Sequence, residues 1–181
     1  MLNKVKNLGQ IYTPTHIVND MLDIIDYQGK KILQKHIIVN SCGDGAFLEI
    51  IIDRYIKAYK EKHNSLIGIE KELEIYIHGI EIDKGEYLKC INNLSQQVFL
   101  RGLSNIKWNI INDDTLENHL FDGKMDYVVG NPPYIRIHNL NENFHKIRNY
   151  DFCKSGMSDM FIVFYEIGFG MLSKNGKLCY I

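Results

Sequence analysis

The stretch HIIVNSCGDG, residues 36–45, decides the fold. Its apolar first part, residues 36–39, is typical of a short buried strand, and a helical pattern follows through about Lys62. Gly43 and Gly45 stand between the two. Glycines at such a junction let the backbone approach a ligand closely, and the helix N-terminus favours a negative group. The stretch therefore predicts the first strand and a ligand-binding loop of an α/β protein, although a plain tight turn would have the same sequence.

Strand-like and helix-like patterns alternate along the rest of the chain. We expect a helix capped by Thr13, with Pro14 as its first residue. Further strands are expected at residues 76–82, 106–111, 125–129 and 177–181, and further helices at residues 65–73, 84–99 and 159–172. The helix at residues 84–99 is expected to carry one apolar side, formed by Leu88, Ile91, Leu94 and Val98. This alternation predicts a doubly wound, Rossmann-like α/β fold with a mainly parallel sheet. Right-handed crossovers then place the loops after the first and fourth strands side by side at the carboxyl edge, where such sheets bind ligands.

The bulk composition is that of an ordinary soluble globular protein. A chain of 181 residues, 45% hydrophobic and 24% charged, suggests one domain over residues 1–181. We find no apolar run close to the roughly 20 residues of a membrane span, and the N-terminus lacks the apolar core of a signal peptide. The four cysteines are widely spaced, with no CxxC pair for a metal, which favours reduced thiols in the cytoplasm.

The charge pattern carries a weaker signal. A net charge of −1 differs from the basic excess of a self-sufficient DNA-binding protein. A mild basic cluster does follow the fourth expected strand, and its members are Arg136, His138, His145, Lys146, Arg148 and Lys154. This cluster is either a solvated face or part of a functional surface.

The loop Asn131-Pro132-Pro133-Tyr134 directly follows the fourth expected strand. Two successive prolines fix two φ angles and remove two backbone donors. Their carbonyls and the Asn131 side chain can then point outward as acceptors, and Tyr134 supplies a flat face beside them. Such a loop suits a planar group that carries an NH2.

An acidic residue ends the second expected strand, and others directly follow the third. Glu81 is well placed to accept from two ribose hydroxyls, and Ile82 could pack on a purine face. Asp114 could accept from an adenine amino group. The alternative at the second strand is that Asp83 caps the following helix and Glu81 is incidental. The alternative for Asp114 is that it serves as a helix N-cap. Together these positions describe a site for adenosine and a small zwitterion, facing an NH2-bearing substrate, and so suggest amino-methyl transfer.

At this point the residues resemble the N6-adenine DNA methyltransferases of restriction–modification systems, in the group whose cofactor motifs precede the catalytic motif. The match runs in family order through residues 9–14, 40–47, 79–83, 114–116 and 131–134, and residues 158–161 and 174–177 fit the later helix and strand. The resemblance implies S-adenosylmethionine as the methyl donor. It also implies that the acceptor is a flipped adenine in double-stranded DNA.

The same resemblance assigns roles by position. Asn131 and the Pro132 carbonyl would accept from the target amino group, Pro133 would complete the catalytic loop, and Tyr134 would stack on the flipped base. For the cofactor, Thr13, Gly43 and Gly45 would bind the methionine end, and Glu81 would bind the ribose. Ile82 and Asp114 would contact the adenine. Further cofactor contacts would come from Asn40, Cys42, Thr115 and Asn131. No metal is needed. Cys42 is interpreted as a packing residue and not as a cytosine-attacking thiol.

The chain departs from the family pattern at two points. Val39 stands where the family usually has an acid, so we expect weaker cofactor binding unless Asn40 or Asp44 compensates. The sequence also stops at its fifth expected strand, an apolar edge, whereas family members continue with two strands, another base-stacking aromatic and a target-recognition domain. We therefore expect an incomplete catalytic domain, inactive alone, whose target recognition lies in a separate chain or a lost C-terminal region.

Other functions fit parts of the pattern. A protein-glutamine N5-methyltransferase or an RNA guanine N2-methyltransferase would also grip a planar amino group, but the Thr13-Pro14 motif and the lack of a preceding substrate domain disfavour both. A catalytically silent subunit with a methyltransferase fold is favoured by Val39 and by the short length.

Overall fold

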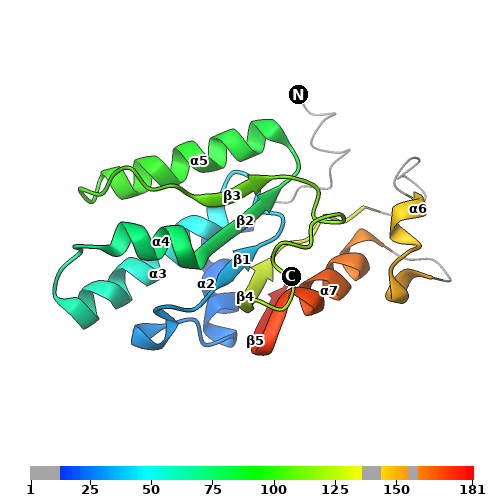
Figure 1. The fold of residues 1–181 in the computed structure, drawn as a ribbon, viewed down its shortest axis with the longest axis horizontal. Coiled ribbons are helices and arrows are strands. Elements are labelled where there is room, and N and C mark those ends of the chain that lie inside the picture. The colour runs from blue at the N-terminus through cyan, green and yellow to red at the C-terminus, as the bar shows by residue number, and fades with distance from the viewer. Residues whose placement is uncertain (1–12, 136–143, 155–158) are drawn as a thin grey trace.

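The computed structural model describes residues 13–135, 144–154 and 159–181. Within these ranges the chain forms a five-stranded sheet with the order β3-β2-β1-β4-β5 (Figure 1). All neighbouring strands are parallel. The strands are β1 (Ile37–Val39), β2 (Ile77–Glu81), β3 (Asn109–Asn112), β4 (Met125–Gly130) and β5 (Leu172–Tyr180). The predicted doubly wound α/β fold is confirmed.

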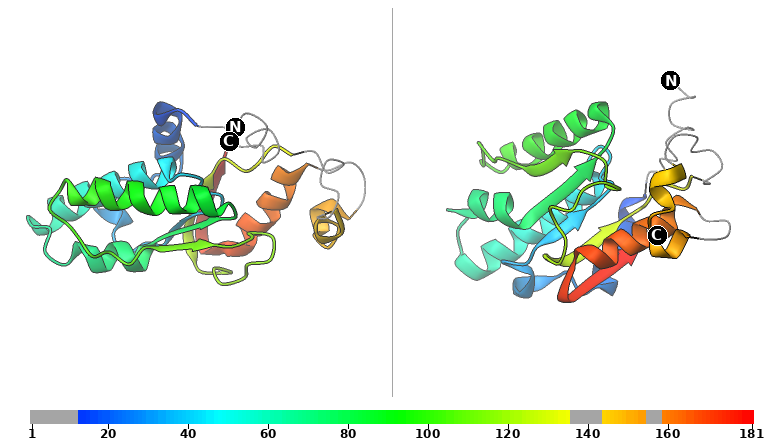
Figure 2. Two further views of the ribbon diagram at one scale, coloured as in Figure 1. Left: turned by 90° about the horizontal axis from the view of Figure 1, so that it is seen from above. Right: turned by 45° about the vertical axis from the view of Figure 1, so that its right-hand side comes forward.

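Helices cover both faces of this sheet. They are α2 (Thr15–Ile24), the 3-10 turn η1 (Gly29–Ile32), α3 (Ala46–His63), α4 (Ile69–Tyr76), α5 (Lys84–Phe99), α6 (Phe144–Ile147), η3 (Asp151–Cys153) and α7 (Met160–Met171). Because side chains alternate along a strand, Ile37 and Val39 pack with α2, α3 and α5, while Ile38 packs on the α7 face. The segment with α6 lies beside α7, at the end of the molecule away from α4 (Figure 2).

The predicted start of the first helix was wrong by one position. Helix α2 begins at Thr15, and Pro14 is its N-cap, with an extended ψ of 143° and no side-chain cap. The Pro14 carbonyl accepts from the backbone N–H groups of Ile17 and Val18. A residue before proline is disfavoured in helical geometry, so Thr13 lies outside the helix and its hydroxyl is available elsewhere.

Other differences concern boundaries and one helix face. Helix α4 starts at Ile69, after Gly68 at a positive φ of 87°, so the expected helix at 65–73 was placed too early. On α5 the buried residues are Cys90, Leu94 and Val98, whereas Leu88, expected on the buried side with Ile91, is 55% exposed. In the described residues, no helix is long and apolar enough to cross a membrane.

Candidate active site

The sheet order brings two loops together at the carboxyl ends of adjacent strands. Strands β1 and β4 pair in parallel, with Val39 opposite Val129, so the glycine loop (residues 40–45) and the catalytic-loop candidate (residues 131–134) leave the sheet side by side. The Ser41 hydroxyl donates to the Asn131 carbonyl at 3.4 Å. The predicted adjacency of these loops is confirmed.

The glycine loop depends on both of its glycines. Gly43 and Gly45 have positive φ angles of 55° and 97°, a backbone conformation that residues with a side chain rarely adopt. A Cβ atom at Gly45 would lie 2.9 Å from the Cys90 sulfur, whereas a Cβ at Gly43 would meet open space. Gly45 is therefore required for packing against α5, and Gly43 leaves room above the loop.

Glu81 anchors this loop to the end of β2. Its Oε2 accepts from the Gly43 N–H and its Oε1 from the Asp83 N–H, each at 2.8 Å. The carboxylate is only 5% exposed, and burial raises the pKa of Glu81 despite these two donors. Val39 cannot accept a hydrogen bond from the loop, and the Gly43 N–H donates to Glu81 instead. The sequence had suggested Asn40 or Asp44 as the compensating residue.

Asn40 and Cys42 of the glycine loop, and Thr115 after β3, have buried side chains. The Asn40 side chain is completely buried on the α7 face, with its Nδ2 3.9 Å from the Met171 sulfur. The Thr115 hydroxyl donates to the Asn40 carbonyl at 2.5 Å. A hydrogen bond to Cys90 and burial hold the pKa of the Cys42 thiol well above its usual range. The three side chains therefore have partners in the interior of the protein.

The expected adenine-binding residues lie at the ends of β2 and β3. Ile82 presents a 56% exposed side chain. Asp114 accepts from the Leu116 N–H at 3.0 Å and lies 3.6 Å from the Lys146 ammonium. Asp114 therefore caps a turn at residues 115–117, where the alternative interpretation expected a helix, and its ion pair ties α6 to the loop after β3.

The described members of the basic cluster have partners within the protein. Lys146 also pairs with Glu117 at 2.8 Å, the Arg148 guanidinium donates to the Cys153 carbonyl, and Lys154 pairs with Asp151. Arg136, His138 and the side chain of His145 lie outside the described part, as do Ser158 and residues 9–12 of the first motif, residues 9–14.

The catalytic-loop candidate is held firmly at its start and exposed at its end. The Asn131 Nδ2 donates to the Thr13 Oγ1 at 3.0 Å. Pro132 is buried and Pro133 half-buried, whereas Tyr134 is 46% exposed. The Tyr134 ring lies beside Phe161 of α7, with ring centroids 6.3 Å apart. The Thr13 contact and the Phe161 support escaped the sequence reasoning, because each joins segments far apart in the chain.

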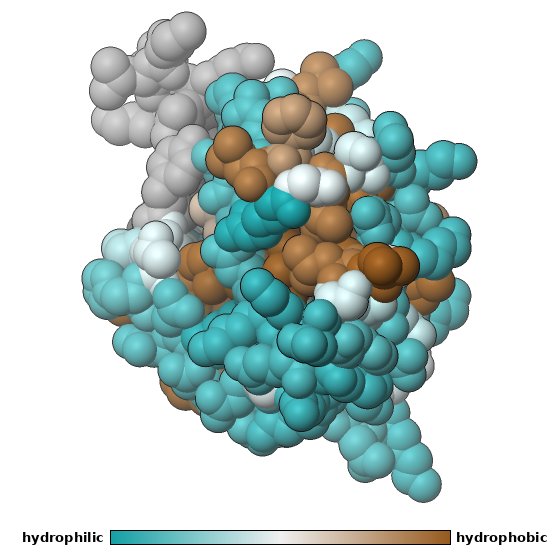
Figure 3. All heavy atoms as spheres, turned by 90° about the vertical axis from the view of Figure 1, so that its left-hand side faces the viewer, coloured by the Kyte–Doolittle hydropathy of each residue, from teal (hydrophilic) through white to brown (hydrophobic). Residues whose placement is uncertain are grey.

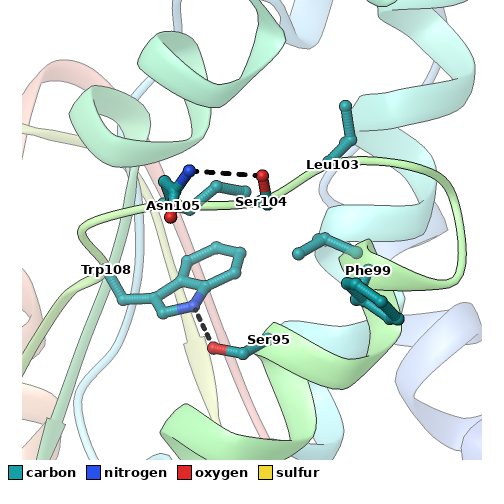
Figure 4. Close-up of a pocket in the computed structure, with 8 residues that line it drawn as sticks. Ser95, Phe99, Leu103, Ser104, Asn105 and Trp108 are labelled. Atoms are coloured by element: carbon teal, nitrogen blue, oxygen red, sulfur yellow. Dashed lines mark hydrogen bonds between the residues drawn. The ribbon is translucent and has the colours of Figure 1, made fainter.

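A separate pocket of about 250 Å³ lies at the opposite end of the strands, between the end of α5 and the stretch before β3. The Trp108 indole donates to the Ser95 hydroxyl at 3.1 Å across it (Figure 4). Phe99 and Leu100 are 71% and 85% exposed beside it, and apolar side chains gather on this side of the molecule (Figure 3). Its position separates this pocket from the carboxyl edge.

Comparison with known proteins gives one family. The model of the Eco57I restriction-modification methylase family matches residues 55–181. The chain is 29% identical to the type II methyltransferase M.BstVI of Geobacillus stearothermophilus, over 94% of this chain and 32% of that protein. It is 26% identical to M.PaeR7I of Pseudomonas aeruginosa, over 96% of this chain and 31% of that protein. The chain thus spans about a third of the length of these relatives.

Solved structures share the fold at low sequence identity. The DrdV–DNA complex matches with a TM-score of 0.72 and 20% identity, over 98% of this chain and 21% of that chain. The M protein of the type I restriction enzyme EcoKI matches with a TM-score of 0.69 and 18% identity, over 95% of this chain and 34% of that chain.

Proposed function

Since the chain belongs to the Eco57I restriction-modification methylase family, we propose that it transfers the methyl group of S-adenosylmethionine to the N6 amino group of adenine in DNA. The observation that carries this proposal is the position of the loop at residues 131–134. It leaves β4 directly beside the glycine loop that leaves β1, and the Ser41–Asn131 hydrogen bond joins the two.

The residues around the glycine loop fit a nucleoside cofactor. Gly43 borders open space, and Ile82 offers an exposed apolar face. Glu81 is the last residue of β2, and Asp114 follows the end of the neighbouring strand β3 by two residues. We assign the ribose to Glu81, the adenine to Ile82 and Asp114, and the methionine end to Thr13 with the glycine loop. S-adenosylmethionine supplies an electrophilic methyl group on a sulfonium.

The catalytic loop acts by positioning acceptors. The lone pair of an adenine amino group is delocalised into the ring, so the nitrogen is a poor nucleophile. The Asn131 side-chain oxygen and the Pro132 carbonyl accept from its two hydrogens and favour a pyramidal nitrogen. Fixed acceptors aimed at developing positive charge act by electrostatic preorganisation. Their value depends on their being held rigidly, which the contacts of Asn131 with Thr13 and Ser41 support.

Tyr134 is assigned to the flipped base. Taking a base out of the duplex costs a few kcal/mol. Stacking on an aromatic ring returns roughly 1–3 kcal/mol, and the Tyr134 ring is 46% exposed while packed on one side by Phe161. Since the net charge is −1, we propose that recognition of double-stranded DNA relies on protein outside these 181 residues, carried by a longer chain or a separate subunit.

The test separates cofactor binding from transfer. Calorimetry with S-adenosylmethionine comes first. The chain is then incubated with unmethylated duplex DNA together with the longer chain or separate subunit that carries DNA recognition, and the released nucleosides are analysed by mass spectrometry. N6-methyladenine supports the proposal, and N4-methylcytosine would overturn the choice of base. Asn131→Ala should abolish transfer and leave binding intact, with Asn92→Ala, on the exposed side of α5, as the matched control. A chain that does not bind the cofactor would instead be a silent module.

A further inference from the structure

Two hydroxyl groups from distant segments hold Asn131 at its two ends. The side-chain Nδ2 donates to the Thr13 Oγ1 at 3.0 Å, across 118 positions of sequence. The main-chain carbonyl of Asn131 accepts from the Ser41 hydroxyl at 3.4 Å, across 90 positions. One hydroxyl precedes α2 and the other lies in the glycine loop, so both segments expected at the cofactor also contact the catalytic candidate.

The Thr13 hydroxyl is presented by a firmly anchored element. Helix α2 follows directly after Pro14, and Arg54 of α3 binds this helix at several points. The Arg54 guanidinium donates to the carbonyl and side-chain oxygens of Asn19 at 3.0 and 2.8 Å, and to the Asp23 carboxylate at 2.6 Å. A site group is precise when its support is itself locked in place. Thr13 therefore meets Asn131 from a defined direction.

This contact bears on the orientation of the Asn131 amide. The oxygen and the NH2 of an amide share one plane, so the direction of one fixes that of the other. The χ2 angle of asparagine is otherwise broad and roughly two-fold. An amide turned by half a rotation would point donors at the donors of the target amino group. Committing Nδ2 to Thr13 keeps the oxygen as the group that can face the target.

We infer that Thr13 is a positioning residue that sets the orientation of the Asn131 amide for methyl transfer. Ser41 supports it by holding the main chain of Asn131. The inference rests on the proposed function for the role of Asn131. It gives Thr13 a partner other than the methionine end of the cofactor, and it ties the segment before α2 to the catalytic loop.

A pair of substitutions isolates the hydroxyl. Thr13→Val keeps the shape of the side chain and removes the acceptor, whereas Thr13→Ser keeps the acceptor. Thr15→Val, on the exposed first turn of α2, is the matched control. The activity-independent readout is the pair of side-chain amide signals of Asn131 in a ¹⁵N–¹H spectrum, identified by their loss in Asn131→Asp. The kinetic readout is kcat and KM for transfer to DNA, beside the Kd for S-adenosylmethionine.

We expect Thr13→Val to shift the Asn131 amide signals and to lower kcat about 10- to 100-fold, the loss typical of a misplaced reacting group. A rise in the Kd for S-adenosylmethionine would report the separate contact of Thr13 with the methionine end, and Thr13→Ser should restore the wild-type signals and rate. Unchanged amide signals in Thr13→Val would overturn the inference. So would a Kd raised with kcat unchanged, since Thr13 would then serve the cofactor alone. Wild-type protein that transfers no methyl group to DNA, even together with the longer chain or separate subunit that recognises DNA, would refute the proposed function, while the amide signals would still decide the Thr13 contact.

Discussion

Glu81 joins the end of β2 to the glycine loop through two backbone donors, Gly43 and Asp83, each 2.8 Å from a carboxylate oxygen. Hydrogen bonds to charged groups contribute about 1.5–3 kcal/mol each. Glu81→Ala removes both acceptors. Because Gly43 and Asp83 are only half-buried, water replaces part of the loss. We therefore expect the free energy of unfolding to fall by about 2–4 kcal/mol.

Glu81→Gln separates the charge from the shape. The glutamine keeps one oxygen acceptor but turns an NH2 toward the second backbone N–H. We therefore expect Glu81→Gln to lower the free energy of unfolding by about half as much as Glu81→Ala does. The substitution should also change the pH dependence. Burial raises the pKa of Glu81 above its ordinary value of 4.5, so the folded protein holds this proton more tightly than the unfolded chain does. The contribution of Glu81 to stability is thus greatest below pH 4.5 and falls as the pH rises through the raised pKa, a trend that Glu81→Gln removes.

Urea unfolding followed by the fluorescence of Trp108, the single tryptophan, measures these changes. Glu61→Gln, on the exposed surface of α3, is the control. An alanine variant within about 0.5 kcal/mol of wild type would refute the anchoring role, since exposed substitutions alone reach that size. A clear loss of stability with unchanged affinity for S-adenosylmethionine would keep the anchor and remove Glu81 from the ribose site.

Three further predictions follow from single contacts. Gly45→Ala should destabilise the protein more than Gly43→Ala, because both positions have positive φ but only the Cβ at Gly45 meets the Cys90 sulfur, at 2.9 Å; equal losses in thermal unfolding would contradict this. Burial lowers the pKa of His78 to about 4 from 6.5, so the neutral ring contributes about 3 kcal/mol to the free energy of unfolding above pH 6.5, and this contribution is lost as the pH falls toward 4. The free energy of unfolding in urea is measured over this pH range, and the same pH dependence in wild type and His78→Asn would refute the prediction. Tyr134→Ala should weaken extrusion of a target base by roughly 1–3 kcal/mol while Tyr134→Phe retains it, measured by the fluorescence of 2-aminopurine in the duplex, and equal signals would remove the stacking role.

Local pattern was enough for most elements. The apolar runs before Gly43 and before Asn131 predicted β1 and β4, and the spacing of Leu94 and Val98 predicted α5, because strand and helix periods are properties of neighbouring residues. The errors lie where local signals compete. Thr13 has the chemistry of a cap, yet the proline after it keeps it out of the helix. Leu88 fits the apolar spacing of α5 but is largely exposed.

The sequence by itself determined the order of strands and helices, the need for glycine between β1 and α3, and the paired prolines after β4. Only the tertiary structure decided which groups meet. The Glu81 carboxylate accepts from the N–H of Gly43, a role that Val39 cannot fill, and the Thr13 hydroxyl accepts from the Asn131 amide. The reason is physical: backbone geometry follows from adjacent residues, but a hydrogen bond of about 3 Å between segments exists only after packing has fixed where both of them lie.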